Sequence, residues 1–216
     1  MILSRARGFL FIHIPKTGGT ALALALEGRA AKDDILVGDT PKARARRQRL
    51  QGIATAGRLW KHSTLADLDG LLQPGEAERL FIFTLVRNPW DRMVSYYHWL
   101  QSQRFENTSV SLAKKLAFSD FLWHDHTGAS IGSWPYGRYL TDASGVERCS
   151  SWLRIEHLDQ DAEPLHRQLG FSLLPLPRVN ASTRAGDYRG YYSDRDAGRV
   201  ADLCQGDITR FGYRFS

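Results

Sequence analysis

The sequence predicts an α/β fold built around a buried, parallel sheet. Residues 9–14 (FLFIHI) and 80–86 (LFIFTLV) are apolar runs of strand length with almost no polar alternation. Such runs are typical of parallel strands that are covered on both faces. Each run precedes a segment with helical character: residues 20–27 alternate Ala and Leu, and residues 90–100 place large apolar side chains at helical spacing. Strands that alternate with helices indicate the α/β class.

Size and composition are those of a globular protein that binds an anion. A chain of 216 residues with 43% hydrophobic content suits one α/β domain, and we expect residues 1–216 to form it. The formal net charge of +6 favours a polyanionic ligand. Nucleic acid, acidic glycans and nucleotides are all polyanions, so the net charge of the protein predicts that its partner is negatively charged but not which kind of molecule it is.

Nothing in the sequence suggests a disulfide-rich or membrane-spanning protein. The two cysteines, Cys149 and Cys204, have neither the spacing of metal ligands nor that of a disulfide framework, which favours free thiols. The apolar run near the N-terminus lacks the cleavage site of a signal peptide, and no apolar run reaches the roughly 18 residues that a transmembrane helix needs. We therefore expect a soluble, cytoplasmic protein with no membrane span.

The loop after the first strand has the features of an anion-binding site. It reads Pro15-Lys16-Thr17-Gly18-Gly19-Thr20. Proline ends the strand, the two glycines allow the backbone to approach a ligand closely, and the start of the next helix presents N–H groups. Lys16 precedes both glycines, whereas the Walker pattern of ATP- and GTP-binding loops places the lysine directly after a glycine.

A second anion site is predicted after the second strand. Arg87 follows the strand, and Asn88 and Pro89 are a good N-cap and a good first residue for a helix. Ser95 lies two helical turns from Asn88, on the same side as the helix start. The planar guanidinium of Arg87 and the hydroxyl of Ser95 can therefore bind the same phosphate.

Together the two segments resemble the donor-binding motifs of sulfotransferases that use 3′-phosphoadenosine 5′-phosphosulfate (PAPS). The 15–20 loop resembles the family's 5′-phosphosulfate loop, and Arg87-Asn88-Pro89 with Ser95 resembles its 3′-phosphate motif, in the same order along the chain. The resemblance implies a three-layer, P-loop-like fold with a central, mainly parallel sheet flanked by helices. It also implies PAPS as donor, Lys16 as a catalytic residue, and no metal.

A histidine between the two motifs is a candidate base. Thr64 and Asp67 resemble a capping box, which predicts a helix over residues 63–72 and places His62 just before its N-terminus. The helix dipole would keep the imidazole neutral and able to accept a proton, although a surface or capping histidine explains the pattern equally well. The segment WKHSTLADL also resembles the branch that includes heparan and other uronosyl sulfotransferases. That resemblance implies that His62 is the base and that the acceptor is a carbohydrate. His98, on the helix that follows Arg87, is the alternative candidate for the base.

The rest of the chain supplies supporting elements and one more ligand contact. We expect helices over residues 111–123, near Tyr136 and over 156–169, a strand over 151–155, and a last helix capped by Ser193 and Asp196. Residues 42–49 form a basic run, which favours a solvated face over a dock for an acidic acceptor. In related enzymes the loop over residues 175–192 closes over the nucleotide, and by that resemblance Arg184 reaches the 3′-phosphate.

Two other classes of function fit parts of the pattern. A P-loop-like kinase or NTPase would require Mg²⁺ and an acidic residue after a buried strand, whereas the strongest strand here ends in Arg87. A non-catalytic binder of nucleotide or acidic glycan would bind without transferring a group. We expect no nucleic-acid partner. The sequence does not distinguish whether the acceptor hydroxyl belongs to a sugar, a lipid, a small phenol or a peptide tyrosine.

Overall fold

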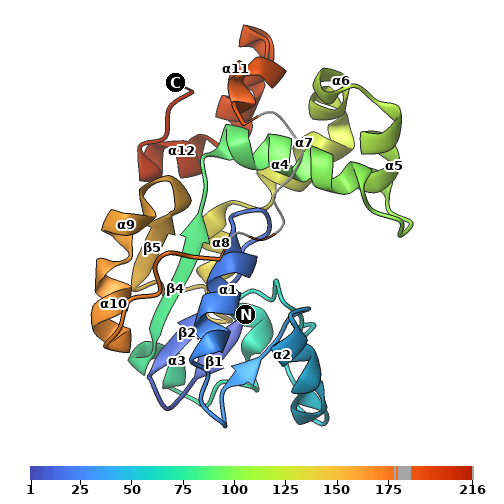
Figure 1. The fold of residues 1–216 in the computed structure, drawn as a ribbon. Helices are drawn as coiled ribbons and strands as arrows, with labels where there is room; N and C mark the ends of the chain where they lie inside the picture. The colour runs from blue at the N-terminus through green and yellow to red at the C-terminus, as the bar shows by residue number, and fades with distance from the viewer. Residues whose placement is uncertain (178, 180–185, 216) are drawn as a thin grey trace. The chain divides into compact units, whose positions relative to one another are not determined.

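A computed structural model describes residues 1–177, 179 and 186–215, and the chain divides into two compact units. The first unit contains Met1–Val86 and Tyr136–Val179 and carries the β-sheet. The second contains Arg87–Pro135 and, within the described residues, the chain from residue 186 onward. Figure 1 shows the elements of both units. That residues 1–216 act as a single domain stays a prediction.

The first unit is built on a mixed, mostly parallel sheet. Its described strands are β1 (Ile2–Ser4), β2 (Phe9–Phe11), β3 (Ile35–Leu36), β4 (Phe81–Val86) and β5 (Ser151–Arg154), in the order β3-β1-β2-β4-β5. Strands β2, β4 and β5 pair in parallel, while β1 pairs antiparallel with both β2 and β3. The predicted α/β class, with a mainly parallel sheet flanked by helices, is confirmed.

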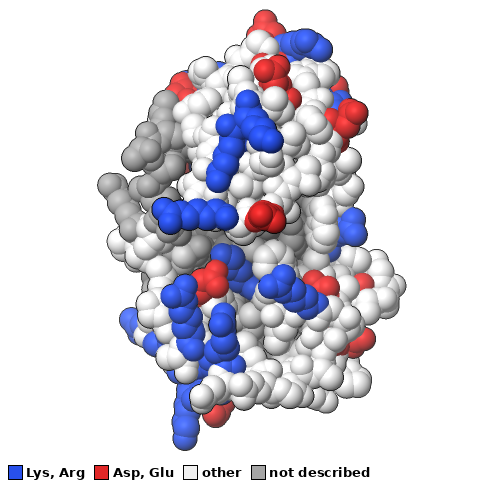
Figure 2. Space-filling model, turned by 90° about the vertical axis from the view of Figure 1, so that its right-hand side faces the viewer, with Lys and Arg blue, Asp and Glu red and all other residues white. Residues whose placement is uncertain are grey.

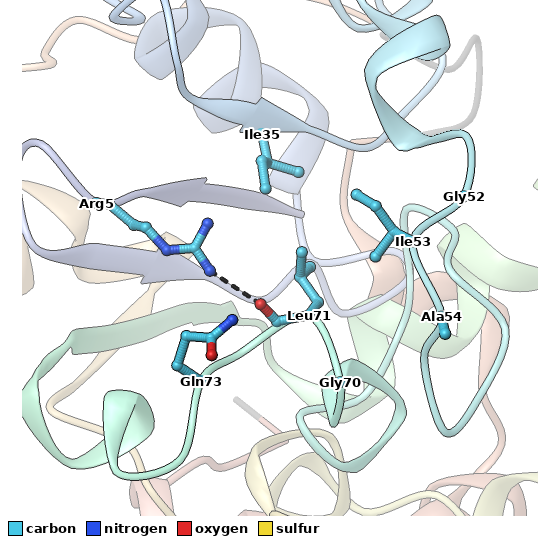
Figure 3. Close-up of a pocket in the computed structure, with 8 residues that line it drawn as sticks. All are labelled: Arg5, Ile35, Gly52, Ile53, Ala54, Gly70, Leu71 and Gln73. Carbon is cyan, nitrogen blue, oxygen red and sulfur yellow. Dashed lines mark hydrogen bonds between the residues drawn. The ribbon is translucent and has the colours of Figure 1, made fainter.

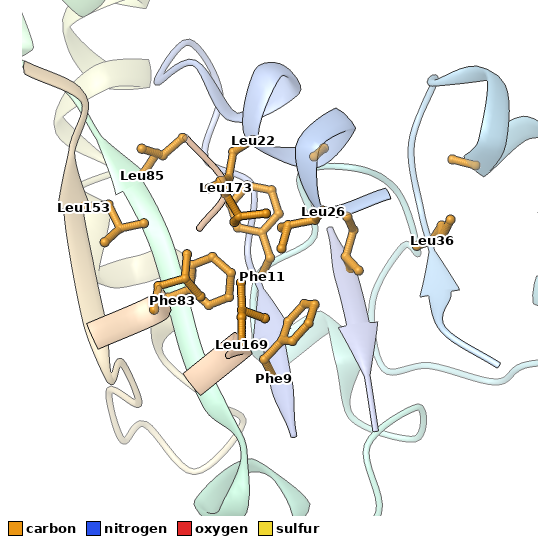
Figure 4. Packing of buried hydrophobic residues seen from close by; sticks show 14 residues of the cluster. Phe9, Phe11, Leu22, Leu26, Leu36, Phe83, Leu85, Leu153, Leu169 and Leu173 are labelled. Atoms are coloured by element: carbon orange, nitrogen blue, oxygen red, sulfur yellow. The ribbon is translucent and has the colours of Figure 1, made fainter. Parts of the chain in front are cut away.

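Apolar side chains of the sheet pack against two helices on one face. The rings of Phe9 and Phe11 lie 5.8 and 5.4 Å from that of Phe83 on the neighbouring strand. Figure 4 shows these rings together with leucines of α1 (Gly19–Gly28) and α10 (Glu163–Leu169). Leu10 and Ile82, which alternate to the other face, are at most 1% exposed, so both faces are covered. This explains why the strands read as continuous apolar runs.

Much of the basic run over residues 42–49 stabilises the end of α1 and the turn after it. The run forms α2 (Pro41–Ala45) and the 3₁₀ helix η1 (Arg47–Leu50). Lys42 donates to the carbonyl oxygen of Glu27 (2.5 Å), Arg46 donates to that of Ala31 (2.8 Å), and Arg49 donates to that of Lys32. Carbonyl groups at the end of a helix lack partners within the helix, and basic side chains satisfy them well.

Of two helices predicted in the first unit, one is divided in the structure and the other is present as expected. The predicted helix over residues 156–169 is wrong as a single element: the structure has η3 (Ile155–His157), α9 (Leu158–Asp161) and α10, which has a proline in its first turn. Proline favours a helix start because it lacks the N–H that a preceding turn would use. The helix expected near Tyr136 is α8 (Tyr136–Leu140), and a short α3 (Glu76–Arg79) precedes β4.

The second unit is helical over its described residues. Its central helix α4 (Pro89–Gln101) starts as predicted, because the side chain of Asn88 accepts a hydrogen bond from the N–H of Trp90 (3.1 Å). Trp90 is anchored further by its indole N–H, which donates to the carbonyl oxygen of Ala197 (2.9 Å). The apolar face predicted for this helix is buried. Other helices of this unit are α7 (Asp125–Gly132) and η4 (Tyr188–Tyr191).

Two further helix predictions in this unit need correction. The helix expected over residues 111–123 is two helices, α5 (Thr108–Lys115) and α6 (Phe118–Trp123), separated by an extended Leu116 whose carbonyl accepts a hydrogen bond from the Tyr97 hydroxyl (2.7 Å). The last helix is likewise divided into α11 (Asp194–Leu203) and α12 (Gln205–Phe211). The capping box of Ser193 and Asp196 at the start of α11 is confirmed.

Candidate active site

The 15–20 loop joins β2 to α1 in a conformation that few residues adopt. Lys16 has a φ of 67°, in the left-handed region that non-glycine residues rarely occupy. Gly18, with a φ of 86°, is the N-cap of α1 and has no side chain that could cap the helix. The buried hydroxyl of Thr17 donates to the carbonyl oxygen of Ile14 (2.9 Å) and so fixes the loop from inside. The N–H groups at the start of α1 thus face the loop, as an anion-binding helix start requires.

Both glycines of this loop lie against side chains of the first unit. A Cβ atom on Gly19 would stand 2.2 Å from Cδ2 of His13, and one on Gly18 would stand 2.3 Å from Cδ1 of Ile155. Real Cβ atoms do not approach other atoms so closely. The glycines are therefore required by packing at the base of the loop as well as by the left-handed backbone of Gly18.

His62 lies beside this loop, held by a main-chain atom. Its Nδ1 is 2.7 Å from the carbonyl oxygen of His13. A carbonyl oxygen only accepts, so Nδ1 carries the hydrogen and donates it, and the neutral ring keeps its lone pair on Nε2. Burial lowers the pKa of His62 to about 4, and the charge of Lys61 acts in the same direction. His62 is therefore neutral near pH 7, with Nε2 able to accept a proton.

The reason for this neutrality differs from the prediction. The helix expected over residues 63–72 is wrong; only a three-residue 3₁₀ helix, η2 (Ala66–Leu68), forms there. The reciprocal hydrogen bonds of the capping box are present, from the N–H of Thr64 to Asp67 (2.7 Å) and from the N–H of Asp67 to Thr64 (3.2 Å). One short turn offers little dipole, so burial rather than a helix terminus keeps the imidazole uncharged.

His13 connects the loop with the candidate base, and the sequence analysis missed it. Its ring lies 4.6 Å from that of His62, edge to face, while the same ring abuts Gly19. Burial lowers its pKa well below the ordinary value, and the neighbouring His62 adds to the effect. The signal was a lone histidine inside an otherwise apolar strand segment directly before the loop. Loop, His13 and His62 thus form one contiguous cluster in the first unit.

Arg87 and Ser95, the predicted second anion site, belong to the second unit. Arg87 directly precedes α4, and its Nε and Nη2 both donate to Oδ2 of Asp91, at 2.8 and 2.5 Å. Ser95 is half-buried on the same helix. Asp91 orients the guanidinium, and the arginine and aspartate stand four residues apart, a spacing that the sequence analysis did not use.

The remaining candidates are less informative. Arg184 lies outside the described residues. His98 is on α4, and its ring contacts those of Tyr97 and Tyr191 at 5.5 and 5.2 Å. In the described part of the chain, no three side chains of His, Cys, Asp or Glu come close enough together to hold a metal ion. Nor does any helix of that part have the length and apolar character needed to cross a membrane.

A hollow of about 450 Å³ in the first unit is separate from this cluster. Figure 3 shows its lining, in which Arg5 donates to the carbonyl oxygen of Leu71 (2.9 Å). Arg5 follows the carboxyl end of β1, and β1 runs antiparallel to β2. The hollow therefore lies at the sheet edge opposite the 15–20 loop, which follows the carboxyl end of β2.

Comparison with known proteins identifies the family. The model of the sulfotransferase family matches residues 1–213. The chain belongs to the sulfotransferase family. Among solved structures, it is similar to mouse sulfotransferase SULT7A1 complexed with PAP, with a TM-score of 0.50 and 14% sequence identity over 95% of this chain and 84% of that one. This likeness supports the fold. Among curated proteins, none matches this chain in sequence.

The contact between Gly19 and His13 predicts the effect of a single added methyl group. Gly19→Ala should lower the free energy of unfolding by about 1–3 kcal/mol, because the ring of His13 or the loop must move. Urea denaturation measures this. Gly28→Ala, at the other end of the same helix, is the matched control: nothing lies within 4 Å of its added Cβ, and its stability should change by less than about 1 kcal/mol. Equal effects of the two substitutions would contradict the packing.

The environment of His62 predicts how stability depends on pH. Because its pKa is about 4 in the folded protein and 6.5 ordinarily, the unfolded chain binds more protons between these values. Stability should therefore fall as the pH is lowered from 6.5 towards 4. Nitrogen-15 NMR of the histidines should show His62 as the neutral tautomer with hydrogen on Nδ1 at pH 6.5, and protonation of its ring only as the pH approaches 4. A midpoint near 6.5 for His62 would show that its ring is not buried as described.

Proposed function

We propose that this sulfotransferase transfers the sulfuryl group from PAPS to an acceptor hydroxyl by in-line displacement. One observation carries the proposal: the uncapped start of α1 and its loop adjoin a neutral histidine whose Nε2 can accept a proton. Sulfuryl transfer resembles phosphoryl transfer, in which positioning and charge stabilisation lower the barrier. A loop for an anionic leaving group beside a base supplies both.

The 15–20 loop is proposed to hold the 5′ end of the donor. The N–H groups of residues 17–20 would bind the 5′-phosphate, and Lys16 would neutralise charge that develops on the oxygen between sulfur and phosphorus. Pro15 is proposed as part of the same loop, although β2 already ends at Phe11 and the proline is not what ends it. The left-handed backbone of Lys16 supports this role, because strained residues concentrate at functional sites. The similar mouse enzyme was solved with PAP, the product that this donor would leave.

Arg87 and Ser95 are proposed to bind the 3′-phosphate of the same nucleotide. The ion pair with Asp91 holds the Nε–Nη2 edge of the guanidinium before any ligand arrives, which lowers the entropy lost on binding. Arg184 is proposed as a further contact to this phosphate on the strength of the family resemblance. No metal has a part in this scheme.

His62 is proposed as the base. As the acceptor oxygen attacks sulfur, its hydrogen passes to Nε2, a sulfur–oxygen bond forms, and the bond from sulfur to the 5′-phosphate oxygen breaks. The product PAP leaves with the bonding electrons, which make its 5′-phosphate a dianion. The pKa near 4 makes the free imidazole a weak base, but the negative charges of a bound donor favour the protonated form and raise that pKa.

A carbohydrate is the proposed acceptor, and the cytoplasm the proposed location, without a nucleic-acid partner. The preference for a carbohydrate rests on the resemblance of the segment around His62 to uronosyl sulfotransferases.

The competing kinase or NTPase needs an acidic metal ligand. The one acidic residue that follows β3 closely, Asp39, is paired with Lys61 at 2.6 Å. That pairing favours the sulfotransferase over a Mg²⁺-dependent enzyme. A non-catalytic binder would bind the donor without transfer.

Calorimetric titration tests the donor site. The wild type should bind PAP without Mg²⁺, and Arg87→Ala should weaken that binding by about tenfold or more, since a charge-assisted hydrogen bond is lost. Arg104→Ala, at an exposed arginine of the same unit, is the control and should leave the affinity unchanged. Preference for ATP with Mg²⁺ over PAP would overturn the proposal in favour of an NTPase.

Kinetic analysis separates the roles of Lys16 and His62. Lys16→Ala should reduce kcat by about 100-fold or more with a much smaller effect on PAP affinity, because the lysine acts on charge that develops during transfer. His62→Ala should reduce kcat by about 100- to 10,000-fold and spare PAP binding. Circular dichroism would establish that both variants fold. Normal turnover of folded His62→Ala would remove it as the base and direct attention to His98.

A further inference from the structure

The segment before and after His62 is a rigid loop. The hydroxyl of Ser63 is fully buried, donates to the carbonyl oxygen of Arg58 (2.8 Å) or Trp60 (2.9 Å), and accepts from the N–H of Trp60 (2.9 Å). Further along, Asp67 lies so close to Gly57 that an added Cβ would meet Oδ1 at 1.9 Å. The backbone of residues 57–67 is therefore fixed before any ligand binds.

This rigid loop presents a tryptophan to solvent next to the candidate base. Trp60 is 40% exposed, although tryptophan is one of the most apolar side chains and is usually well buried. Its ring lies 5.0 Å from that of His62, at 86° to it. An exposed aromatic surface on a fixed backbone binds a ligand with little loss of conformational entropy.

Positive charge surrounds the same tryptophan. The guanidinium of the exposed Arg58 lies 5.4 Å from the centre of its ring. Lys61 follows Trp60 in the chain and pairs with Asp39 at 2.6 Å, and Arg44 is close enough to contribute to the lowered pKa of Asp39. In Figure 2, Lys and Arg side chains gather on the lower part of the face shown. Asp39 is paired with Lys61, and Arg58 and Arg44 add further positive charge, so the surface beside His62 favours an anionic ligand.

We propose that Trp60 and Arg58 form the acceptor-binding subsite, and that the acceptor is an acidic oligosaccharide with a sugar ring on Trp60 and a carboxylate on Arg58. This inference rests on the proposed function and adds the residues that select the acceptor. Sugar rings present C–H groups that pack on an indole, and an arginine pairs with a carboxylate through two parallel hydrogen bonds. The apolar part of a lipid would contact Trp60 but would not pair with Arg58, and a simple phenol has no acid group that could pair with Arg58.

A pair of matched oligosaccharides tests the proposal. The probes are a hexasaccharide of alternating glucuronate and N-acetylglucosamine, and the same hexasaccharide with its carboxylates reduced to alcohols. Calorimetry on the PAP-bound protein gives binding, and sulfate transfer from PAPS gives kcat and KM. The wild type should bind the acidic form about two- to fivefold more tightly than the reduced form, as expected for an exposed ion pair. Added salt should reduce the difference.

Variants assign the effect to the two residues. Arg58→Gln should bind both hexasaccharides alike, and Trp60→Ala should raise KM for both, while each variant keeps the wild-type affinity for PAP. Arg47→Ala, at an exposed arginine of η1, is the charge-matched control and should retain the preference for the acidic form. Tight PAP binding with no difference between the hexasaccharides, or unchanged KM in Trp60→Ala, would overturn the subsite alone. Loss of PAP binding in the wild type would instead overturn the proposed donor.

Discussion

The approach of Gly19 to the ring of His13 is the contact on which the rest of the candidate site depends. It allows the first turn of α1 to pack directly on the side chain of His13, two residues before the loop begins. The same residue, through its carbonyl oxygen, holds the imidazole of His62. The side chain of His13 thus sets the position of the anion-binding loop, and its carbonyl oxygen sets the orientation of the base. Donor loop and base share a common support, so their separation is fixed by packing in a dense interior rather than by flexible side chains.

Sequence patterns were enough to predict the elements that carry this arrangement. The apolar runs of β2 and β4, the glycine-rich loop and the Asn-Pro start of α4 all depend on local chemistry, and the structure has them where they were expected, except that β2 ends at Phe11 and not at Ile14. The helix after His62 was predicted wrongly because Thr64 and Asp67 do form their capping bonds but the chain turns away after η2. A capping box specifies how a helix begins and says little about how long it continues.

Other features depend on contacts between distant parts of the sequence and could not be predicted from it. The neutrality of His62 comes from burial against a strand end 49 positions earlier. The division of the chain between α5 and α6 involves the hydroxyl of Tyr97, on a different helix. The basic run over residues 42–49 looked like a solvated face, yet three of its side chains bind carbonyl groups near the end of α1. Charge patterns in a sequence do not distinguish a binding surface from such main-chain capping.

The group that orients His62 belongs to the main chain of His13 and not to its side chain. In many enzymes the residue that fixes a catalytic histidine is a carboxylate, which a single substitution can remove. Every amino acid at position 13 would supply the same carbonyl oxygen, so the tautomer of His62 is insensitive to what that position encodes. It is sensitive instead to the path of the backbone at the end of β2. The orientation of His62 therefore depends on the fold and not on the side chain at position 13. A related protein can carry another side chain at position 13 and still keep the proton of this histidine on Nδ1.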